Sequence, residues 1–570
     1  MRVGADFILE ALAREGVDHV FMVPGGLVDP FLPAFGRQQA LIPIVAAQEG
    51  GAAYMADGYA RASGNFGAAL CIGGPGLANA VTAVATAQSD GSPLLLMSGE
   101  VATDLEGLGV FQDASPQTLD DVAIMKPLTR YSSSIDNPKN MRHLFQHALL
   151  QLRAQPAAPV HLSLPGDCLT TEISVSHFPI DRALVDYDAL SFAAAESSLQ
   201  HFLRVSGGKI AILAGAGVEH SNAAEALKEF AELWDIPVAT TLRGKGVFPE
   251  DHPLSLGVFG YAGTHHARAA LTDPSLDLLI ILGSGLNERD TMHWALQVTP
   301  NASICVNLSP AAIGTHVQDG GIVGSCGAYL CYLLDQSDTL RGALEPTRAA
   351  RATWMSQIRA EPRLQDPENC ASDAVPIHPA RVIRELRKAL PRDGVLVVDS
   401  GAHRAFAGHY WEAYEPRTYV SATNLGPMGW AIGAAVGVQC AQPRRRVAVV
   451  TGDGCMRMGG MEIATAARYQ LPVIFVVINN AALGNVWLRA HQLGPTPDEL
   501  TRLPDHDWAG FAQSLGSRAE TVRSPGDLAG AFERALQGEG PCLVDVKADK
   551  AFTTPVKDWA SAIAAYSYHE

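Results

Sequence analysis

Residues suited to metal and phosphate chemistry are concentrated in one stretch of the chain. Gly452-Asp453-Gly454 is followed, after 24 residues, by Asn479-Asn480. Residues 447–450 are apolar and mostly β-branched, which predicts a buried central strand that ends just before this motif. Ligands bind at the carboxyl edge of such sheets, so we expect Asp453 at a binding edge. The glycines allow a phosphate to approach the backbone closely, and the N-terminus of a following helix favours an anion.

The second half of this unit is expected to return to the same edge. Residues 461–471 predict a crossover helix that ends at Pro472, and residues 473–478 predict the neighbouring strand, which delivers Asn480. An Asp carboxylate, an Asn amide oxygen and a loop carbonyl are hard oxygen ligands. Together with diphosphate oxygens they would complete an octahedral Mg²⁺ site. An ordinary βαβ turn in which Asp453 caps a helix is the alternative explanation.

This pair of motifs resembles the cofactor motif of thiamine-diphosphate-dependent enzymes. The resemblance extends over nearly the whole chain and is nearest to the acetolactate synthase and pyruvate oxidase branch, which also contains lyases and decarboxylases acting on acyl-CoA. It implies thiamine diphosphate and Mg²⁺ as cofactors, with Asp453, Asn480 and the Ala482 carbonyl as protein ligands of the metal. His403 matches a diphosphate-contacting position, although a capping histidine on a surface loop would also explain it. The cofactor-binding residues implied here are Gly401, Ala402, His403, Gly452, Asp453, Gly454, Cys455, Asn480, Ala482, Leu483 and Gly484.

Residues 49–64, EGGAAYMADGYARASG, resemble the family segment that carries the catalytic glutamate, which the resemblance places at Glu49. The chemistry independently requires an acid, because the C2 proton of thiamine is only weakly acidic. A carboxyl group bonded to the pyrimidine N1′ favours the imino tautomer, whose N4′ can remove that proton. A helix-capping glutamate after the strand-like residues 41–48 is the plainer alternative.

Two further glycine-rich loops resemble family segments around the cofactor rings. Val23-Pro24-Gly25-Gly26 matches the loop near the thiazolium, and Gly73-Gly74-Pro75-Gly76 with Asn79 matches the loop that packs the pyrimidine. The family usually has Thr-Ser before Gly-Pro-Gly, whereas this chain has Ile72-Gly73, so a hydroxyl contact is lost. The cofactor-binding residues implied in this part of the chain are Pro24, Gly25, Gly26, Glu49, Pro75 and Asn79.

Residues 424–429, NLGPMG, resemble the segment that bends the cofactor into a V shape. The resemblance implies a catalytic role for Met428 as the apolar wedge between the two rings, and it implies that the Gly426 carbonyl accepts the 4′-amino proton. A flexible, core-filling methionine is the alternative. The family binds the pyrimidine and the diphosphate on the first and third domains of opposite subunits. A homodimer at least, and a homotetramer as the larger assembly, are therefore expected.

Phe111-Gln112-Asp113 matches the position where acetolactate synthases carry Phe-Gln-Glu beside the reacting carbon. Gln112 is therefore expected to be catalytic, by hydrogen bonding to the substrate carbonyl or the bound intermediate, with Gly25 and Phe111 beside the substrate. Two positions depart from those enzymes. Their lysine after the strand ending in Leu-Pro is Gly166 here, and their tryptophan that selects the second keto acid falls at Arg489. Arg489 would suit a carboxylate or another anionic group, or it is a solvated helix arginine.

Flavin binding is an open question in the middle of the chain. Residues 244–264 resemble the flavin-associated stretch of acetolactate synthases, but Gly285 stands where those enzymes carry an arginine, and only Arg289 remains. The loop LAGAG at residues 213–217 lacks the full GxGxxG pattern of dinucleotide-binding folds, so a plain strand-to-helix turn also explains it. FAD, ADP and an empty degenerate site are the three alternatives.

The elements that must position these residues fall into three blocks, each alternating buried strands with helical patterns, as doubly wound parallel sheets do. We expect an α/β protein of three doubly wound parallel-sheet domains, in the order pyrimidine-binding, central and diphosphate-binding. The expected bounds are 1–175, 190–340 and 376–550, with a linker at 341–375 and an aromatic-rich tail at 551–570. The tail is expected to be mobile or to fold over a site.

The bulk composition excludes several other classes of protein. A chain of 570 residues is too long for one core, and 47% hydrophobic with 18% charged residues indicates globular domains. The net charge of −17 argues against nucleic acid or an anionic membrane as a partner. No apolar run reaches the ~20 residues of a membrane span, and the N-terminus does not resemble a signal peptide. The nine cysteines lack metal-binding spacing, so a cytoplasmic location is expected.

These residues predict a thiamine-diphosphate- and Mg²⁺-dependent carboligase. It would decarboxylate a 2-oxo acid, pyruvate in the first instance, and transfer the acyl anion to a carbonyl acceptor, giving a 2-hydroxy ketone or an acetohydroxy acid. The histidine pair of simple pyruvate decarboxylases is replaced by Ala114-Ser115, and His265-His266 is expected to be structural. The alternative is a lyase or decarboxylase that cleaves acyloins or 2-hydroxyacyl-CoA. A scaffold protein without catalysis is disfavoured because Glu49, Asp453 and Asn480 are all present.

Overall fold

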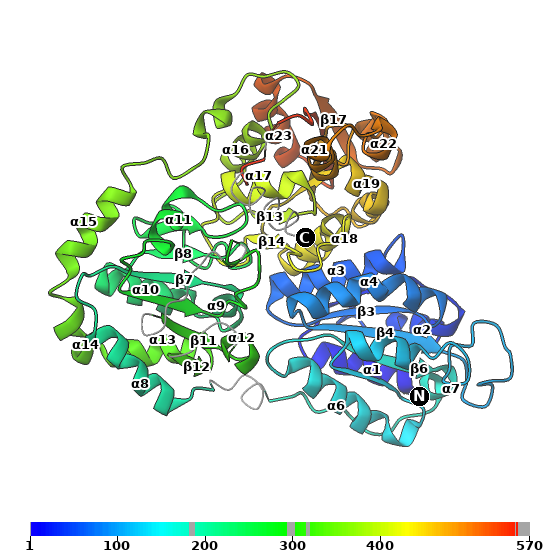
Figure 1. The fold of residues 1–570 in the computed structure, drawn as a ribbon. Helices are drawn as coiled ribbons and strands as arrows, with labels where there is room; N and C mark the ends of the chain where they lie inside the picture. Colours follow the sequence, from blue (N-terminus) through cyan, green and yellow to red (C-terminus); the bar gives the residue numbers. More distant parts are fainter. Residues whose placement is uncertain are drawn as a thin grey trace.

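The computed structural model describes residues 2–181, 189–292, 294, 303–314, 320–552 and 554–556. They build three six-stranded sheets whose strands all pair in parallel, each interleaved with helices (Figure 1). The expected α/β fold with three doubly wound parallel sheets is confirmed. Residues 557–570 of the predicted tail lie outside the described residues. No helix in the described ranges is long and apolar enough to cross a membrane.

The first sheet has the strand order β2-β1-β3-β4-β6-β5. Its strands are β1 (His19–Met22), β2 (Ile42–Val45), β3 (Gly67–Ile72), β4 (Leu94–Glu100), β5 (Tyr131–Ser134) and β6 (Val160–Pro165). Its helices are α1 (Gly4–Arg14), α2 (Phe31–Gly36), α3 (Glu49–Ser63), α4 (Pro75–Asp90), α5 (Asp121–Met125), α6 (Met141–Arg153) and α7 (Gly166–Thr170). The order reverses between β1 and β3, so a crevice opens at their carboxyl ends.

The central sheet has the order β12-β11-β10-β7-β8-β9 and reverses between β7 and β10. Its strands are β7 (Ile210–Ala214), β8 (Val238–Thr240), β9 (Ser255–Val258), β10 (Leu278–Leu282), β11 (Ser303–Asn307) and β12 (Gly321–Val323). The helices here are α8 (Phe192–Leu203), α9 (Ala216–His220), α10 (Ala224–Trp234), α11 (His265–Leu271), α12 (Pro310–Gly314), α13 (Cys326–Asp335), α14 (Ser337–Leu344) and α15 (Arg348–Ile358).

The third sheet has the order β14-β13-β15-β16-β18-β17 and reverses between β13 and β15. Its strands are β13 (Val395–Val398), β14 (Tyr419–Ser421), β15 (Val447–Gly452), β16 (Ile474–Asn479), β17 (Arg518–Val522) and β18 (Cys542–Lys547). The helices are α16 (Pro379–Ala389), α17 (Ala402–Tyr410), α18 (Trp430–Ala441), α19 (Asp453–Gly459), α20 (Glu462–Arg468), α21 (Gly484–Leu493), α22 (Trp508–Ser514) and α23 (Leu528–Gln537).

The crossover between β15 and β16 differs from the single helix expected over residues 461–471. It consists of α19 and α20, with a break at residues 460–461. The reason is a close approach of two backbones: a side chain at Gly459 would lie 2.6 Å from the Gly429 carbonyl oxygen. Because Gly459 has no side chain, the loop that precedes α18 can lie against the end of α19, and α20 begins after this contact.

The first and third domains pack through α3 and α18. A Cβ atom at Gly58 would lie 2.1 Å from the Ala434 carbonyl oxygen, and one at Gly437 would lie 1.8 Å from the Met55 carbonyl oxygen. The two helices therefore approach at backbone distance, which only glycine permits at these positions. The Trp430 indole N–H donates to the buried Asp57 carboxylate at 2.8 Å and fixes the register of the two helices.

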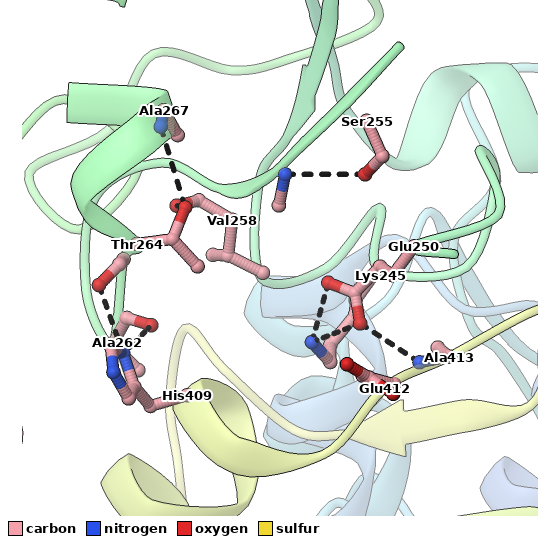
Figure 2. Close-up of polar contacts among 12 residues, drawn as sticks. Lys245, Glu250, Ser255, Val258, Ala262, Thr264, Ala267, His409, Glu412 and Ala413 are labelled. Atoms are coloured by element: carbon pink, nitrogen blue, oxygen red, sulfur yellow. Dashed lines mark hydrogen bonds and ion pairs between the residues drawn. The ribbon is translucent and has the colours of Figure 1, made fainter. Parts of the chain in front are cut away.

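The central and third domains are joined by a buried polar cluster (Figure 2). The Lys245 ammonium lies 2.7 Å from Oε1 of Glu250, with both side chains almost wholly enclosed. The second Glu250 oxygen accepts the Ala413 N–H at 2.8 Å, and His409 Nδ1 lies 3.0 Å from the Gly263 carbonyl oxygen. Because removing one member would leave a buried charge without its partner, this cluster fixes the docking of the central domain.

Candidate active site

The switch point of the third sheet holds a cavity that is open to solvent on one side. Its walls are the loop after β13, the loop after β15, the loop after β16, and the start of α21. The predicted residues that line it are Gly401, Ala402, His403, Met428, Gly452, Asp453, Gly454, Cys455, Asn480, Ala482, Leu483, Gly484 and Arg489. The structure therefore brings together segments that lie as far apart as residues 401 and 489 in the sequence.

Asp453 is the only predicted metal ligand with a charge, and it is 2% exposed. Its two carboxylate oxygens accept the backbone N–H groups of Gly454 and Ala482, each at 3.0 Å. Desolvation by burial raises the pKa of Asp453 to about 6, because two neutral N–H donors compensate the lost hydration only in part. A divalent cation would stabilise the ionised form far more strongly.

The other two predicted ligands lie beside this carboxylate. The Ala482 N–H is shared between Asp453 and the Asn480 side-chain oxygen, which it meets at 3.2 Å. The two side-chain oxygens thus converge on one backbone group at the edge of the sheet. The described residues contain no group of three or more His, Cys, Asp or Glu side chains that could hold a metal ion by themselves. One carboxylate, one amide and one carbonyl suit a hard cation that completes its shell with phosphate oxygens.

The same cavity offers a cradle for an anion. His403 is 6% exposed, and its Nε2 atom has no hydrogen-bond partner among the described residues. Burial lowers the pKa of His403 to about 3, so the free ring is neutral. A Cβ atom at Gly454 would lie 2.9 Å from the Met428 terminal methyl, and one at Gly452 would lie 3.0 Å from the His403 ring. Glycine therefore lets Met428 and His403 pack directly against this loop, and the unpartnered His403 Nε2 beside the start of α19 fits a diphosphate.

Asp399, the residue after β13, holds the loop that carries Met428 through hydrogen bonds. Asp399 Oδ1 accepts the Gly429 N–H at 3.0 Å, and Oδ2 accepts the Thr451 hydroxyl at 3.0 Å. Desolvation raises the pKa of this wholly buried carboxyl to about 6. Gly426 is not among the cavity-lining residues and has φ +63°, which lets the loop turn next to Arg404.

The predicted residues of the first domain gather at the switch point of the first sheet. Glu49 is the first residue of α3, and the Asn79 side-chain amide donates to its Oε2 at 2.9 Å. The Ile72 side chain fills the space between the two glycine loops, since Cβ atoms at Gly25 and Gly76 would each lie 2.8 Å from it. The departure from Thr-Ser therefore replaces a hydroxyl by an apolar wedge. Pro24, Gly26 and Pro75 belong to the same two loops.

These two groups of residues do not share a cavity within one chain. All residues that line the third-sheet cavity come from positions 379–552, so Glu49, Asn79 and Gln112 are not among them. Large apolar side chains are exposed around both groups, among them Leu108 (72%), Phe111 (85%), Met458 (64%) and Met461 (53%).

The two predicted substrate residues lie in different settings. Gln112 has φ +60° in the loop between β4 and α5, a backbone conformation rare for a residue with a side chain. Arg489 lies on α21 at the rim of the cavity and is exposed. Its charge contributes to a lowered pKa of Arg289, for which desolvation is the larger cause.

The glycine loops of the central sheet are explained by packing against each other. A Cβ atom at Gly215 would lie 2.5 Å from the Gly283 carbonyl oxygen, and one at Gly217 would lie 2.6 Å from the Gly283 Cα. The loop 213–217 forms a strand-to-helix turn between β7 and α9. The flavin-like stretch 244–264 contributes Lys245 and Glu250 to the domain interface of Figure 2.

Comparisons with known proteins show the family of this chain. Three family models match: the thiamine pyrophosphate enzyme N-terminal TPP binding domain at residues 2–124, the central domain at 205–333 and the C-terminal TPP binding domain at 399–546. A protein of Methanocaldococcus jannaschii named probable acetolactate synthase large subunit is 33% identical, covering 97% of this chain and 93% of its own. The chain belongs to the thiamine pyrophosphate enzyme family.

Two other relatives of this thiamine pyrophosphate enzyme are informative. The glyoxylate carboligase of Escherichia coli O157:H7 is 29% identical, over 95% of this chain and 92% of its own. A solved structure described as a thiamin diphosphate-dependent enzyme isolated from Mycobacterium smegmatis has a TM-score of 0.77, 22% identity, and coverage of 96% of this chain and 99% of its own. The acetolactate synthase and the glyoxylate carboligase are named for C–C bond formation, and the solved structure shows the shared fold. The protein is thus an acetolactate synthase-like, thiamine-diphosphate-dependent enzyme of C–C bond formation.

The structure also adds cavity residues that the sequence did not single out. Ser400, Pro379, Phe406, Asp549, Lys550 and Phe552 line the cavity. The Cys455 thiol donates to the Ser400 carbonyl oxygen at 3.2 Å. Phe552, one of the described residues of the predicted tail, packs its ring 4.2 Å from that of His378. The aromatic composition of the tail was the one available signal for this contact.

Proposed function

We propose that this enzyme uses thiamine diphosphate and Mg²⁺ to decarboxylate a 2-oxo acid, pyruvate in the first instance. It then transfers the acyl anion to a carbonyl acceptor, which gives a 2-hydroxy ketone or an acetohydroxy acid. The observation that carries the proposal is the cavity at the β13–β15 switch point, where Asp453, Asn480 and the orphaned His403 Nε2 converge. The names of the relatives, acetolactate synthase and glyoxylate carboligase, support the same type of reaction.

The third domain would hold the charged half of the cofactor. Asp453, Asn480 and the Ala482 carbonyl would bind Mg²⁺. His403 and the backbone N–H groups at the starts of α17, α19 and α21 would donate to the diphosphate. When bound, thiamine diphosphate would supply a nucleophilic carbon at C2 and a cationic thiazolium ring able to take up the electron pair released with CO₂. The enclosing walls would exclude water from that position.

The first domain of a second copy would complete the site, because one chain leaves Glu49 outside the third-sheet cavity. Glu49, oriented by Asn79, would hold a proton at the pyrimidine N1′. Met428 would lie between the two rings from the other side. Gln112, with Phe111 and Gly25 nearby in the same domain, would face the reacting carbonyl oxygens, and Arg489 would face the acceptor. This arrangement requires a homodimer, and a homotetramer would be a pair of such dimers.

A product balance tests the reaction. The holoenzyme is supplied with pyruvate plus an aldehyde or a second keto acid, and chiral chromatography of the products is compared with the CO₂ released. Formation of a 2-hydroxy ketone faster than free acetaldehyde or acetate is expected, since the positioned histidine pair that would favour protonation is absent at Ala114-Ser115. Acetaldehyde as the main product would show that the enzyme is a decarboxylase and not a carboligase. Cleavage of a 2-hydroxyacyl-CoA or an acyloin without pyruvate turnover would show that the enzyme is a lyase.

A further inference from the structure

Two buried carboxyl groups lie at the base of the loop that carries Gln112, residues 101–114. Glu100 ends β4 and Asp121 begins α5, so the two residues flank this loop in the sequence. Glu100 is 3% exposed and Asp121 is 1% exposed. A Cβ atom at Gly73 would lie 3.0 Å from Asp121 Oδ2 and 3.6 Å from Glu100 Oε2. Both groups of this carboxyl pair therefore reach the same point, next to the glycine loop that was matched to the pyrimidine.

Glu100 closes the Gln112 loop at both of its ends. Its Oε1 atom accepts the N–H of Val101 at 2.8 Å and the N–H of Ala114 at 3.1 Å, the first and the last residue of the loop. Asp121 also binds Ala114, because its backbone N–H donates to the Ala114 carbonyl oxygen at 3.0 Å. Gln112, with φ +60°, lies only two residues before this doubly bound alanine. The position of Gln112 therefore depends on the carboxyl pair.

Asp121 extends these contacts to the glycine loop, residues 73–76. Its Oδ2 atom accepts the Gly74 N–H at 3.0 Å. A Cβ atom at Gly74 would lie 3.8 Å from the Ala114 Cβ, which is an ordinary van der Waals distance. The Gln112 loop and the glycine loop are thus in contact, and both are hydrogen-bonded to the same pair of carboxyl groups.

The two carboxyl groups cannot both be ionised without a large cost. Glu100 Oε2 and Asp121 Oδ1 are buried and have no hydrogen-bond partner among the described residues. The charged groups with the largest effect on the pair are acids, namely Asp113 and Glu106 on Glu100, and Asp120 on Asp121. Desolvation raises the pKa of Glu100, and desolvation together with Glu100 raises the pKa of Asp121 to about 7. The pair is therefore most stable when it carries one proton.

Loss of this proton would weaken the contacts that hold the Gln112 loop. Two ionised carboxylates would repel each other in a buried setting, where their interaction is poorly screened. The nearby Cys71 thiol of β3 adds no positive charge, and its pKa is raised by burial and by Asp121, so it stays neutral. Separation of the pair would release a backbone N–H that Glu100 or Asp121 now accepts, at the Gln112 loop or at the glycine loop.

We propose that Glu100 and Asp121 are positioning residues for Gln112, which hold the base of its loop against the glycine loop while the carboxyl pair carries a proton. This inference rests on the proposed function, in which Gln112 faces the reacting carbonyl oxygens. Because both carboxyl groups are buried, they act on the reaction through Gln112. The loop is held below neutral pH and loosens as the pH rises through about 7, the pKa of Asp121.

Hydrogen exchange of the peptide spanning residues 101–114, measured on the full-length holoenzyme, tests this role and does not depend on turnover. With rates normalised to the intrinsic exchange at each pH, protection in the parent should fall between pH ~6 and ~8. Glu100→Ala should lose protection about tenfold or more at every pH, the scale of a lost hydrogen bond to a charged group. Glu100→Gln keeps the accepting oxygen and should retain protection. Asp121→Asn should retain it and remove its pH dependence.

A kinetic comparison separates positioning of Gln112 from a general structural role. Glu100→Ala should lower kcat for 2-hydroxy ketone formation about 10²-fold, the scale of a misplaced group, and Glu100→Gln should restore most of it. C2–H exchange of bound thiamine diphosphate should stay near the parental rate in both variants, since Glu49 lies on α3 and not in this loop. Asp104→Asn, which changes an exposed acid of the same loop, is the matched control and should behave as the parent does.

Each outcome decides one part of the proposal. Equal protection of residues 101–114 in the parent and in Glu100→Ala would overturn the positioning role, as would a parallel fall of turnover and C2–H exchange in that variant. If Asp121→Asn kept the pH dependence of the parent, the proton on the pair would be ruled out. If the parent formed no 2-hydroxy ketone, the proposed function would fail, while the exchange measurements would still decide whether the carboxyl pair holds the loop.

Discussion

The Asn79 side-chain amide donates a hydrogen bond to the Glu49 carboxylate at 2.9 Å. Glu49 is the first residue of α3, which follows β2, and Asn79 lies on α4, which follows β3. Since the amide occupies one carboxylate oxygen, the other is left to face a ligand. Glu49 is therefore held in one orientation before any cofactor binds, which is the condition for efficient proton transfer at a fixed atom.

Glu49→Gln keeps the shape of the side chain but cannot stabilise a proton on the pyrimidine N1′ in the same way. Turnover and C2–H exchange of bound thiamine diphosphate should fall by about 10²–10⁴-fold, the scale of a lost acid–base group. Proton NMR of the C2 exchange measures it. Asn79→Ala should give a smaller loss, because the carboxylate remains but is no longer oriented. Exchange at the parental rate in Glu49→Gln would remove the residue from the mechanism.

Asp453→Ala removes the one charged side chain of the proposed metal site. Treatment with EDTA followed by dialysis should inactivate the parent, and Mg²⁺ plus thiamine diphosphate should restore it. The variant should not be restored at ordinary cofactor concentrations, since the diphosphate loses the cation that neutralises it. Metal content and activity after reconstitution are the measurements. A variant that regains full activity would show that the metal is held elsewhere.

Asp121 provides a pH test of stability in the first domain. Its buried carboxyl accepts the Gly74 N–H at 3.0 Å, and desolvation together with Glu100 raises its pKa to about 7. The folded protein therefore binds this proton more tightly than the unfolded chain, whose aspartates have a pKa near ~4. The stability it contributes is complete below pH ~4 and is lost as the pH rises through about 7.

Asp121→Asn keeps the acceptor for Gly74 but cannot ionise. Its unfolding midpoint should rise above that of the parent increasingly between pH ~4 and ~7, at roughly 2–4 °C per kcal/mol, and the difference should then level off. Differential scanning calorimetry of both proteins across this range gives the answer. Asp104→Asn, at an exposed position of the same domain, is the control and should show no such growth with pH. A constant difference would mean that Asp121 does not take up a proton on folding.

The sequence predicted best where one short segment determines both structure and chemistry. The Gly452-Asp453-Gly454 motif follows an apolar strand, so β15 and its loop could be placed from local pattern alone. The loops at Gly25 and Gly74 follow β1 and β3 for the same reason. Each expected glycine loop lies at a switch point, because strand ends carry the residues that must turn close to a ligand.

Other features depend on contacts between distant segments and could not be predicted. The break between α19 and α20 arises from the approach of Gly429 to Gly459, which no local pattern shows. The Lys245–Glu250 pair is five residues apart, but its burial depends on Ala413 of another domain. The bond from Asp90 to Thr423 spans 333 residues. Hydrophobic periodicity describes one helix or strand at a time, so it cannot predict contacts between residues this far apart in the sequence.

The separation of Glu49 from the third-sheet cavity leads to a prediction about assembly. If each active site combines Glu49 of one chain with Asp453 of its partner, then two inactive variants should complement each other. Co-expressed Glu49→Gln and Asp453→Ala chains that pair at random would form about a quarter of their sites from two intact domains. Activity of the mixture should therefore approach about a quarter of the parental value, although each variant alone is inactive. The control mixes Asp453→Ala with Asn480→Ala, which damage the same domain and should not complement. If the first mixture stays as inactive as the control, each site is built within a single chain and the proposed dimer is wrong.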